Sequence, residues 1–125
     1  QFRLLKHNTP GSYTFILQAT KEIPKRLQHP KRSTIGVRIP DHAIALALLE
    51  ELGEPLLSST MILPNEESPL NDAQQIRALL EQQVDLVIDG GAVAAEPTSV
   101  IDLTHDMPML IRAGRGDTAH FLFGN

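Results

Sequence analysis

Cysteine and tryptophan are both absent from this chain of 125 residues, and aromatic residues make up only 4% of it. Without cysteine the chain can form neither a disulfide nor a thiolate metal site. Its longest apolar run, residues 43–49, is far shorter than the roughly 20 residues that a transmembrane helix needs. No secretory signal pattern opens the sequence. The remaining composition, 42% hydrophobic and 21% charged, is typical of a globular domain without a membrane partner, and we expect a cytoplasmic location.

The common catalytic signatures are missing as well. The sequence has no Walker A loop, no Rossmann glycine pattern and no Gly-x-Ser-x-Gly turn. Its five histidines show no metal-ligand spacing. Composition does not exclude a Ser-His-Asp triad, but no segment favours one. We therefore predict neither a metal site nor a protein nucleophile.

Charge is unevenly distributed along the chain, which carries a net charge of -4 at pH 7. Residues 1–40 contain eight Lys or Arg and one acid, a net charge of +7, whereas residues 41–125 contain three and fourteen, a net charge of -11. A basic region can attract a phosphate-bearing ligand through its local field even in an acidic protein. The same cations can equally form an ordinary solvated surface.

Hydrophobic periodicity predicts a mixture of strands and helices. Strands are expected at Tyr13–Leu17, Ser33–Ile39, Pro55–Met61, Val84–Ile88, Ser99–Leu103 and Met109–Arg112, and helical segments at residues 2–5, Glu22–Leu27, Ala43–Leu52 and Asp72–Gln83. The order lacks a strict βαβ rhythm. The predicted fold class is therefore α+β (mixed α/β), an open twisted mixed β-sheet with packed helices.

Several local features refine this prediction. Asp41 is a favourable N-cap for the helix at 43–52, and Gly53 suits its left-handed C-terminal position. That helix is apolar on most sides, so we expect it to be well buried. The glycine-rich tail from Gly114 is expected to be loose. Because the chain opens inside an amphipathic pattern, we expect residues 1–125 to be a partial domain whose N-terminal portion is missing.

The first candidate site is a turn at Pro10-Gly11 that leads into a strand carrying Thr14. Glycine has no side chain, so the backbone there can approach a ligand closely. Most Pro-Gly pairs, however, are plain turns.

The second candidate lies on the next strand, where Thr34, Gly36 and Arg38 share one face. An arginine on a sheet offers a planar fork to a carboxylate or phosphate. The helix N-terminus that follows favours anions too. The alternative is an arginine paired with a nearby acid beside an ordinary helix start.

Hydroxyl groups mark two further candidates. Ser58 to Thr60 follow an apolar segment. Thr98 stands at the start of one predicted strand, and the next predicted strand ends at Arg112. Hydroxyls and arginine can hold phosphate or carboxylate oxygens. Strand ends capped by their own side chains would explain the same pattern. Together these segments suggest anion recognition.

Taken in order, these segments resemble the YrdC/YciO family. The likeness covers nearly the whole chain and is strongest to the YciO branch, in residues 20–24 and 60–64. It is carried by residues 10–14, 34–42, 53–60, 97–102 and 111–114. The resemblance implies a YrdC/RibB-like open twisted structure with a concave face.

The resemblance also implies a function. Family members join ATP, L-threonine and bicarbonate into threonylcarbamoyl-AMP and pyrophosphate, for threonylcarbamoyl modification of tRNA adenosine, with Mg²⁺ accompanying ATP. The implied ATP-binding residues are Thr34, Thr60 and Arg112. The implied L-threonine-binding residues are Arg38, Ser58 and Thr98. Pro10, Gly11 and Thr14 would supply pocket backbone.

Two departures bear on activity. Where the synthases carry Ser-x-Asn, this chain has Thr60-Met61-Ile62, which replaces the Asn amide with an apolar side chain. The Lys-x-Arg segment of the family is not in this chain. We therefore expect the full-length protein to be the enzyme and this fragment alone to be inactive.

Two other functions remain open. One is a double-stranded RNA or tRNA-binding module without catalysis, whose affinity would fall with salt; the scarcity of aromatic residues argues against stacking on single strands. The other is a structural or regulatory fragment that binds no ligand.

Overall fold

The computed structural model describes residues 2–29, 31–93 and 96–121. The chain forms two compact units, one of residues 1–55 with 97–125 and the other of residues 56–96. Among the described residues, no helix combines the length and the apolar character needed to cross a bilayer.

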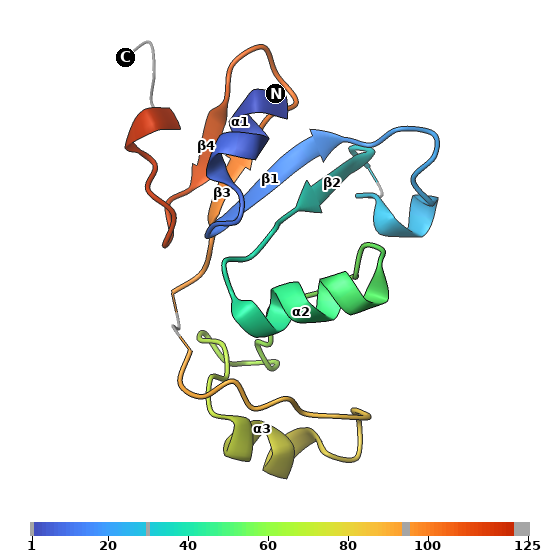
Figure 1. Cartoon of the computed structure of the whole chain (residues 1–125), viewed down its shortest axis with the longest axis vertical. Coiled ribbons are helices and arrows are strands. Elements are labelled where there is room, and N and C mark those ends of the chain that lie inside the picture. The colour runs from blue at the N-terminus through green and yellow to red at the C-terminus, as the bar shows by residue number, and fades with distance from the viewer. Residues whose placement is uncertain (1, 30, 94–95, 122–125) are drawn as a thin grey trace. The chain divides into compact units, whose positions relative to one another are not determined.

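The first unit is built on a four-stranded mixed sheet (Figure 1). The strands lie in the order β2-β1-β3-β4, with bounds β1 Tyr13–Gln18, β2 Thr34–Val37, β3 Ser99–Asp102 and β4 Met109–Arg112. The β1 strand runs antiparallel to β2 but parallel to β3, and β3 runs antiparallel to β4. This confirms the predicted mixed sheet and four of its predicted strands.

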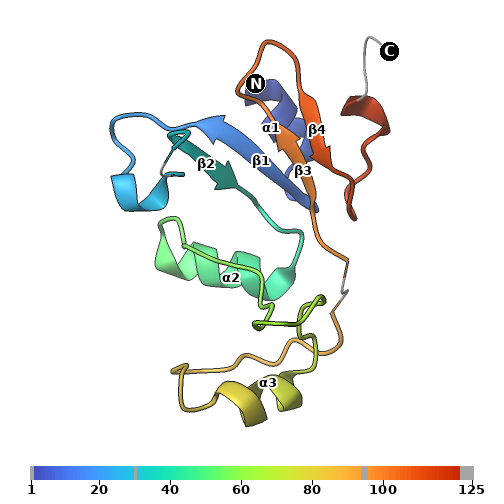
Figure 2. The ribbon, with the colours of Figure 1, turned by 180° about the vertical axis from the view of Figure 1, so that it is seen from behind.

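One face of this sheet forms the hydrophobic core. Phe15 and Ile101 are directly opposite each other and fully buried. Tyr13, Leu103 and Phe121 complete the buried cluster. The helix α1, Phe2–Asn8, lies over this face, with leucines packed against the cluster (Figures 1 and 2). Because side chains alternate along a strand, the intervening residues point to the opposite face.

A buried hydroxyl anchors the segment after β4. Ser99 Oγ donates a hydrogen bond to the Gly116 carbonyl (2.7 Å) and accepts one from the Gly114 amide (2.9 Å). The Tyr13 hydroxyl donates to the Asp117 carbonyl (2.9 Å). The short helix η2, Ala119–Phe121, then places its phenylalanine in the core. The prediction of a loose tail from Gly114 is therefore wrong as far as residue 121, and residues 122–125 lie outside the described residues.

The connection between β1 and β2 is long and turns tightly at its end. It contains the 3₁₀ turn η1, Lys25–Leu27, inside the predicted helical segment. Ser33 has a positive φ of 54°, a conformation unfavourable for a residue with a side chain. Its backbone accepts a hydrogen bond from Ala19 N (2.9 Å) and donates one to His29 O (3.1 Å). These bonds fix the backbone where β2 begins.

The helix α2, Ala43–Leu52, has the predicted bounds and ends at Gly53 with φ 71°, as expected. Two other predictions about it are wrong. The N-cap is His42 and not Asp41, because the helix begins at Ala43. The His42 side chain makes no capping hydrogen bond. The helix is also not well buried, since Leu48 and Leu52 are 44% and 47% exposed. An apolar helix can bury only what neighbouring elements cover, and the described residues leave almost half of each of these two leucines uncovered.

The second unit contains the helix α3, Ala73–Leu80, shorter than predicted. Its N-cap is Asp72, whose carboxylate accepts a hydrogen bond from Gln74 N (2.9 Å). The predicted strands at 55–61 and 84–88 are wrong. Ile62 N instead bonds to Thr60 O within a tight turn (3.0 Å), and Val84 N bonds back to Leu80 O at the helix end (3.1 Å). No described strand pairs with either segment.

The close packing of Gly116 yields a stability prediction. A Cβ on Gly116 would lie 2.5 Å from Tyr13 Cε1, so either the ring or the tail must shift. We expect Gly116→Ala to lower the free energy of unfolding by about 1–3 kcal/mol, as overpacking does. Urea denaturation measures this change. Gly36→Ala is the control, because its added Cβ would approach Thr14 Cγ2 only to 3.3 Å. Equal losses in both variants would contradict the prediction.

Candidate functional site

The face of the sheet opposite the core carries most of the predicted site residues of the first unit; we call it the polar face. The β1 residues on it alternate with the core residues Tyr13, Phe15 and Leu17. The polar face comprises Thr14, Ile16 and Gln18 from β1, Thr34 and Gly36 from β2, Thr98, Val100 and Asp102 at β3, and Arg112 of β4.

Three of the predicted residues form one hydrogen-bonded group, the Arg112 cluster of Thr14, Thr98 and Arg112. The two threonine hydroxyls lie 2.8 Å apart although 84 residues separate them in sequence. Arg112 donates from Nε and Nη2 to the Thr98 carbonyl (3.1 and 2.9 Å) and approaches the Thr98 hydroxyl at 3.4 Å. Arg112 is exposed, so the group is open to solvent.

Gly36 and Arg38 extend this face toward β2. Gly36 is opposite Ile16, and an added Cβ would meet Thr14 Cγ2 at 3.3 Å, which places Gly36 on the polar face. The alternation along the strand directs Arg38 the same way. Arg38 is exposed, and no acid among the described residues forms an ion pair with it. The described residues therefore do not show the alternative in which Arg38 pairs with a nearby acid.

Thr34 lies on the polar face but away from the Arg112 cluster. It is opposite Gln18, four residues along β1 from Thr14. At about 3.3 Å per residue, the separation along the strand is about 13 Å. Ser58 and Thr60 belong to the second unit, where both are exposed. The structure thus brings together Thr14, Thr98 and Arg112, and it places Thr34 at the far end of the same face.

Pro10 and Gly11 belong to a turn whose contacts are structural. Gly11 N donates to Ile39 O (2.9 Å), which prolongs the pairing of β1 with the β2 segment. An added Cβ on Gly11 would lie 2.6 Å from Asn8 O at the end of α1. Close contact between α1 and β1 therefore explains this glycine, and the role of Pro10 and Gly11 toward a ligand stays a prediction.

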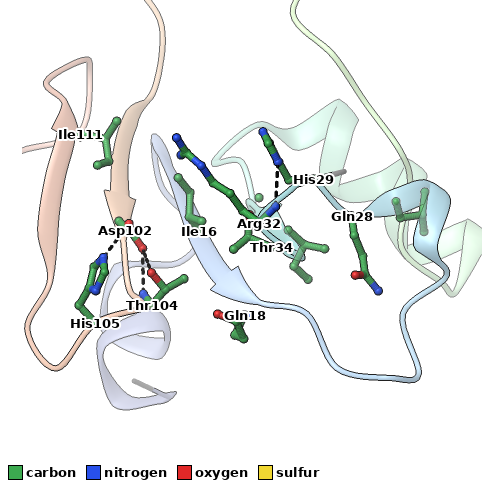
Figure 3. A pocket seen from close by; sticks show the side chains of 13 residues that line it. Ile16, Gln18, Gln28, His29, Arg32, Thr34, Asp102, Thr104, His105 and Ile111 are labelled. Atoms are coloured by element: carbon green, nitrogen blue, oxygen red, sulfur yellow. Dashed lines mark hydrogen bonds and ion pairs between the residues drawn. The ribbon is translucent and has the colours of Figure 1, made fainter.

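A cavity of about 760 Å³ opens at the Thr34 end of the polar face (Figure 3); we call it the Asp102 cavity. It lies where the parallel strands β1 and β3 both end, a common location for ligand sites in open sheets with parallel strands. Its polar lining includes Gln18, His29, Arg32, Thr34, Asp102 and His105. Of these, the sequence predicted only Thr34 as a site residue.

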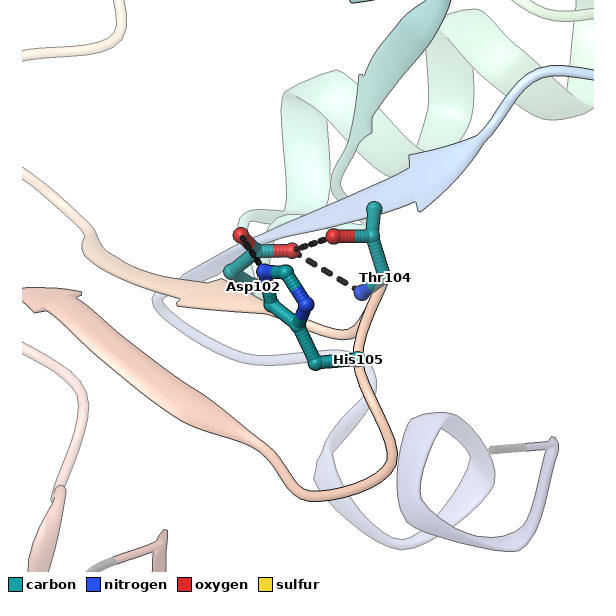
Figure 4. A network of polar contacts seen from close by, with 3 residues as sticks. All are labelled: Asp102, Thr104 and His105. Carbon is teal, nitrogen blue, oxygen red and sulfur yellow. Dashed lines mark hydrogen bonds and ion pairs between the residues drawn. The ribbon is translucent and has the colours of Figure 1, made fainter.

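Asp102, which lines the cavity, is the centre of a small polar network (Figure 4). Its Oδ1 accepts hydrogen bonds from the Thr104 amide (2.9 Å) and the Thr104 hydroxyl (2.6 Å). Its Oδ2 lies 3.7 Å from Nε2 of His105. The Thr104 hydroxyl is the main cause that holds the pKa of Asp102 below its usual value, and the charges of His105 and Arg32 act in the same direction. An aspartate followed two residues later by threonine is a recognisable Asx-turn signal that could have indicated this arrangement.

Metal ligands do not gather in the part of the chain that the structure describes. No group of three His, Asp or Glu side chains there could hold an ion. The polar groups on this face are instead threonine hydroxyls, the Gln18 amide, the Asp102 carboxylate and the Arg112 guanidinium.

The comparison with protein families decides the identity of this fold. The model of the Sua5/YciO/YrdC family, whose description is telomere recombination, matches residues 1–114. The chain belongs to the Sua5/YciO/YrdC family. Its predicted family and its α+β fold are both confirmed.

Relatives within the family carry different names, and only some of them are named as synthases. Escherichia coli YciO is 55% identical over 121 residues, and its crystal structure superposes with a TM-score of 0.89 over 97% of this chain. The threonylcarbamoyl-AMP synthase of Bacillus subtilis is 31% identical over 113 residues. The structure of Pyrococcus abyssi Sua5 with L-threonine superposes with a TM-score of 0.78, at 28% identity, over 90% of this chain.

The chain spans only part of each relative. It covers 59% of the length of Escherichia coli YciO and 32% of the Bacillus subtilis synthase. It covers 33% of the Pyrococcus abyssi protein chain. The family match over residues 1–114 includes the residues of the polar face.

The Asp102 network predicts a pH-dependent stability. The pKa of Asp102 is depressed in the folded state, so its stabilising effect is present above the unfolded-state pKa, near 3.8, and is lost as pH falls through the lower folded-state pKa. We expect Asp102→Asn, which keeps the shape, to lower the free energy of unfolding at pH 7 and to approach wild type near pH 2. Denaturation at several pH values measures this difference. A loss independent of pH would contradict it.

Proposed function

We propose that the protein containing this chain binds ATP and L-threonine on the polar face and forms threonylcarbamoyl-AMP, as synthases of the family do. The Arg112 cluster carries the proposal. Thr98 and Arg112, which the sequence predicted from two separate segments, are in direct contact on the solvent-exposed polar face. Thr14, also predicted, lies beside them. The likeness to named synthases and to a threonine-bound relative supports the same substrates.

The proposed reaction suits these side chains. Threonine amine and bicarbonate first form a carbamate with loss of water; a carbamate oxygen then bonds to the α-phosphorus of ATP as the bond to the β-phosphate oxygen breaks and pyrophosphate leaves. Two anions must be brought together, so arginine and hydroxyl donors must offset their repulsion. Holding the two reactants in line lowers the entropic part of the barrier. No protein nucleophile is required.

The proposed roles follow the sequence predictions. Arg38 would bind the threonine carboxylate through its planar fork. Thr98 and, in the second unit, Ser58 are the other residues predicted to bind L-threonine. Arg112, Thr34 and Thr60 would contact ATP. Mg²⁺ would arrive bound to the phosphates of ATP, because the described residues form no carboxylate cage of their own.

RNA binding is the second candidate, and one observation favours it. Five exposed cations occupy the single connection between β1 and β2, namely Lys21, Lys25, Arg26, Lys31 and Arg32. Such a group can neutralise backbone phosphates. Salt-sensitive retention of double-stranded RNA on filters, together with failure to bind ATP and L-threonine, would favour this function over the synthase.

Arg112 gives a direct test in the full-length protein. We expect Arg112→Gln to weaken ATP binding about tenfold or more, because a charged donor to phosphate is lost. Isothermal titration calorimetry with ATP and with L-threonine measures both affinities. The matched control is Arg3→Gln on α1, which lies over the opposite face of the sheet. A folded Arg112→Gln protein with wild-type ATP affinity would refute the role.

Ile62 gives a second test. In the proposed site it occupies the place of an asparagine whose amide would contact the nucleotide side. A recovered hydrogen bond of about 1 kcal/mol corresponds to roughly a fivefold change. We therefore expect Ile62→Asn to raise the rate of pyrophosphate release about fivefold in the full-length protein.

Met61→Asn is the control for this change, because it adds the same amide at the neighbouring position. An increase of equal size in both variants, or in neither, would argue against a specific contact at residue 62.

A further inference from the structure

We propose that the His29 side chain is a pH switch: its neutral ring holds the turn before β2 closed, and protonation of the ring opens that turn and releases Arg32. The turn consists of His29 and residues 31–34, and we call it the His29 turn. The proposal does not depend on the proposed function, because it concerns the response of the fold to pH.

The switch is a pair of hydrogen bonds to one ring nitrogen. His29 Nδ1 accepts from the backbone amides of Lys31 (3.1 Å) and Arg32 (3.2 Å, Figure 3). A ring nitrogen accepts only through a free lone pair, so the proton of the neutral ring lies on Nε2. An imidazolium carries a proton on both nitrogens and accepts at neither. Protonation therefore removes both bonds at once and sets a ring N–H against two amide N–H groups.

The backbone of the His29 turn is strained. Ser33 has φ 54°, a left-handed conformation that a residue with a side chain keeps only where its surroundings impose it. His29 O accepts a hydrogen bond from Ser33 N (3.1 Å), and His29 N donates one to Thr34 O (2.8 Å). The ring and the backbone of His29 thus hold the same turn. When the two ring bonds are lost, fewer bonds remain to oppose the strain at Ser33.

Protons reach the ring readily, because His29 is exposed. Histidine is the side chain whose charge ordinarily changes between about pH 5 and pH 8. No acid among the described residues forms an ion pair with His29. The charged and titratable groups of the adjoining elements are mixed in sign: Lys31 and Arg32 on the same turn, Lys21, Glu22, Lys25 and Arg26 earlier in the connection, Glu50 and Glu51 at the end of α2, and Asp102 and His105 on the cavity wall.

Opening of the His29 turn would change the Asp102 cavity. Arg32 is the one Lys or Arg among the described residues that line this cavity. Its side chain extends beside Ile16 toward β3 (Figure 3). Thr34, on the same turn, also lines the cavity. Acid therefore frees the cation of the cavity wall from its fixed position and loosens the start of β2.

Two substitutions separate the acceptor from its titration. In His29→Asn the side-chain oxygen is as many bonds from the backbone as Nδ1 is, so an acceptor remains that takes no proton in the range where histidine does. In His29→Gln the oxygen lies one bond further out, so the two amides lose their acceptor. Both replacements are neutral and polar, and the pair differs in where the acceptor lies.

Amide NMR of the full-length protein from about pH 8 to about pH 5 measures the state of the turn. In wild type we expect the amide shifts of Lys31 and Arg32 to change with the same midpoint as the ring nitrogens of His29. Protection of the Ser33 amide, corrected for the intrinsic effect of pH on exchange, should fall about fivefold. The turn should stay closed at every pH in His29→Asn and be open at every pH in His29→Gln.

His105→Gln is the matched control, because it removes the other histidine of the cavity, which lies 3.7 Å from Asp102. The transition of the turn should persist in this variant, and its loss there would assign the transition to the Asp102 network and overturn the proposal. Three further results would overturn it: a wild-type turn that stays closed down to about pH 5, a His29→Asn turn that still opens, or a His29→Gln turn as protected as that of wild type.

Discussion

The parallel pairing of β1 with β3 is the constraint on which the rest of this structure depends. It joins residues 13–16 to residues 99–102 across a long stretch of sequence. Its register puts Phe15 against Ile101 on one face and therefore Thr14 and Thr98 together on the other. A shift of one residue would reverse both faces, moving the aromatic core to solvent and the hydroxyls inward. Core packing and the candidate site are thus set by the same ladder.

Much of the first unit could be predicted from residue patterns. The β-branched and aromatic composition of residues 13–17 and the alternation in residues 33–39 predicted two strands. The alternation also predicted that Thr34, Gly36 and Arg38 share a face. Gly53 marked the end of α2 because only a residue without a side chain adopts its conformation easily. The pattern also predicted which segments carry the candidate anion-binding groups. It could not show their spacing, and the structure separates Thr34 from the Arg112 cluster by four residues along β1.

The failures have common physical causes. Segments 55–61 and 84–88 have strand-like compositions, but a strand exists only when a neighbouring strand pairs with it, and no strand among the described residues pairs with either segment. Burial of α2 was inferred from composition, although burial depends on what covers a helix. The ordered tail is held by the buried Ser99 hydroxyl, by the Tyr13 hydroxyl and by Phe121 in the core, and these contacts leave no periodic signal in the sequence. The Asp102 cavity likewise draws on Arg32, Asp102 and His105, which are distant in sequence.

We propose that the polar face, and not the core face or α1, receives the ligands. Methyl-labelled NMR of the full-length protein, titrated with L-threonine and ATP, tests it most directly. We expect saturable shifts for the methyl groups of Thr14, Thr98 and Ile16. Ile101 in the core and Leu5 on α1 should stay near their unliganded positions. Saturable binding that leaves Thr14 and Thr98 unchanged while it shifts Leu5 would contradict the account.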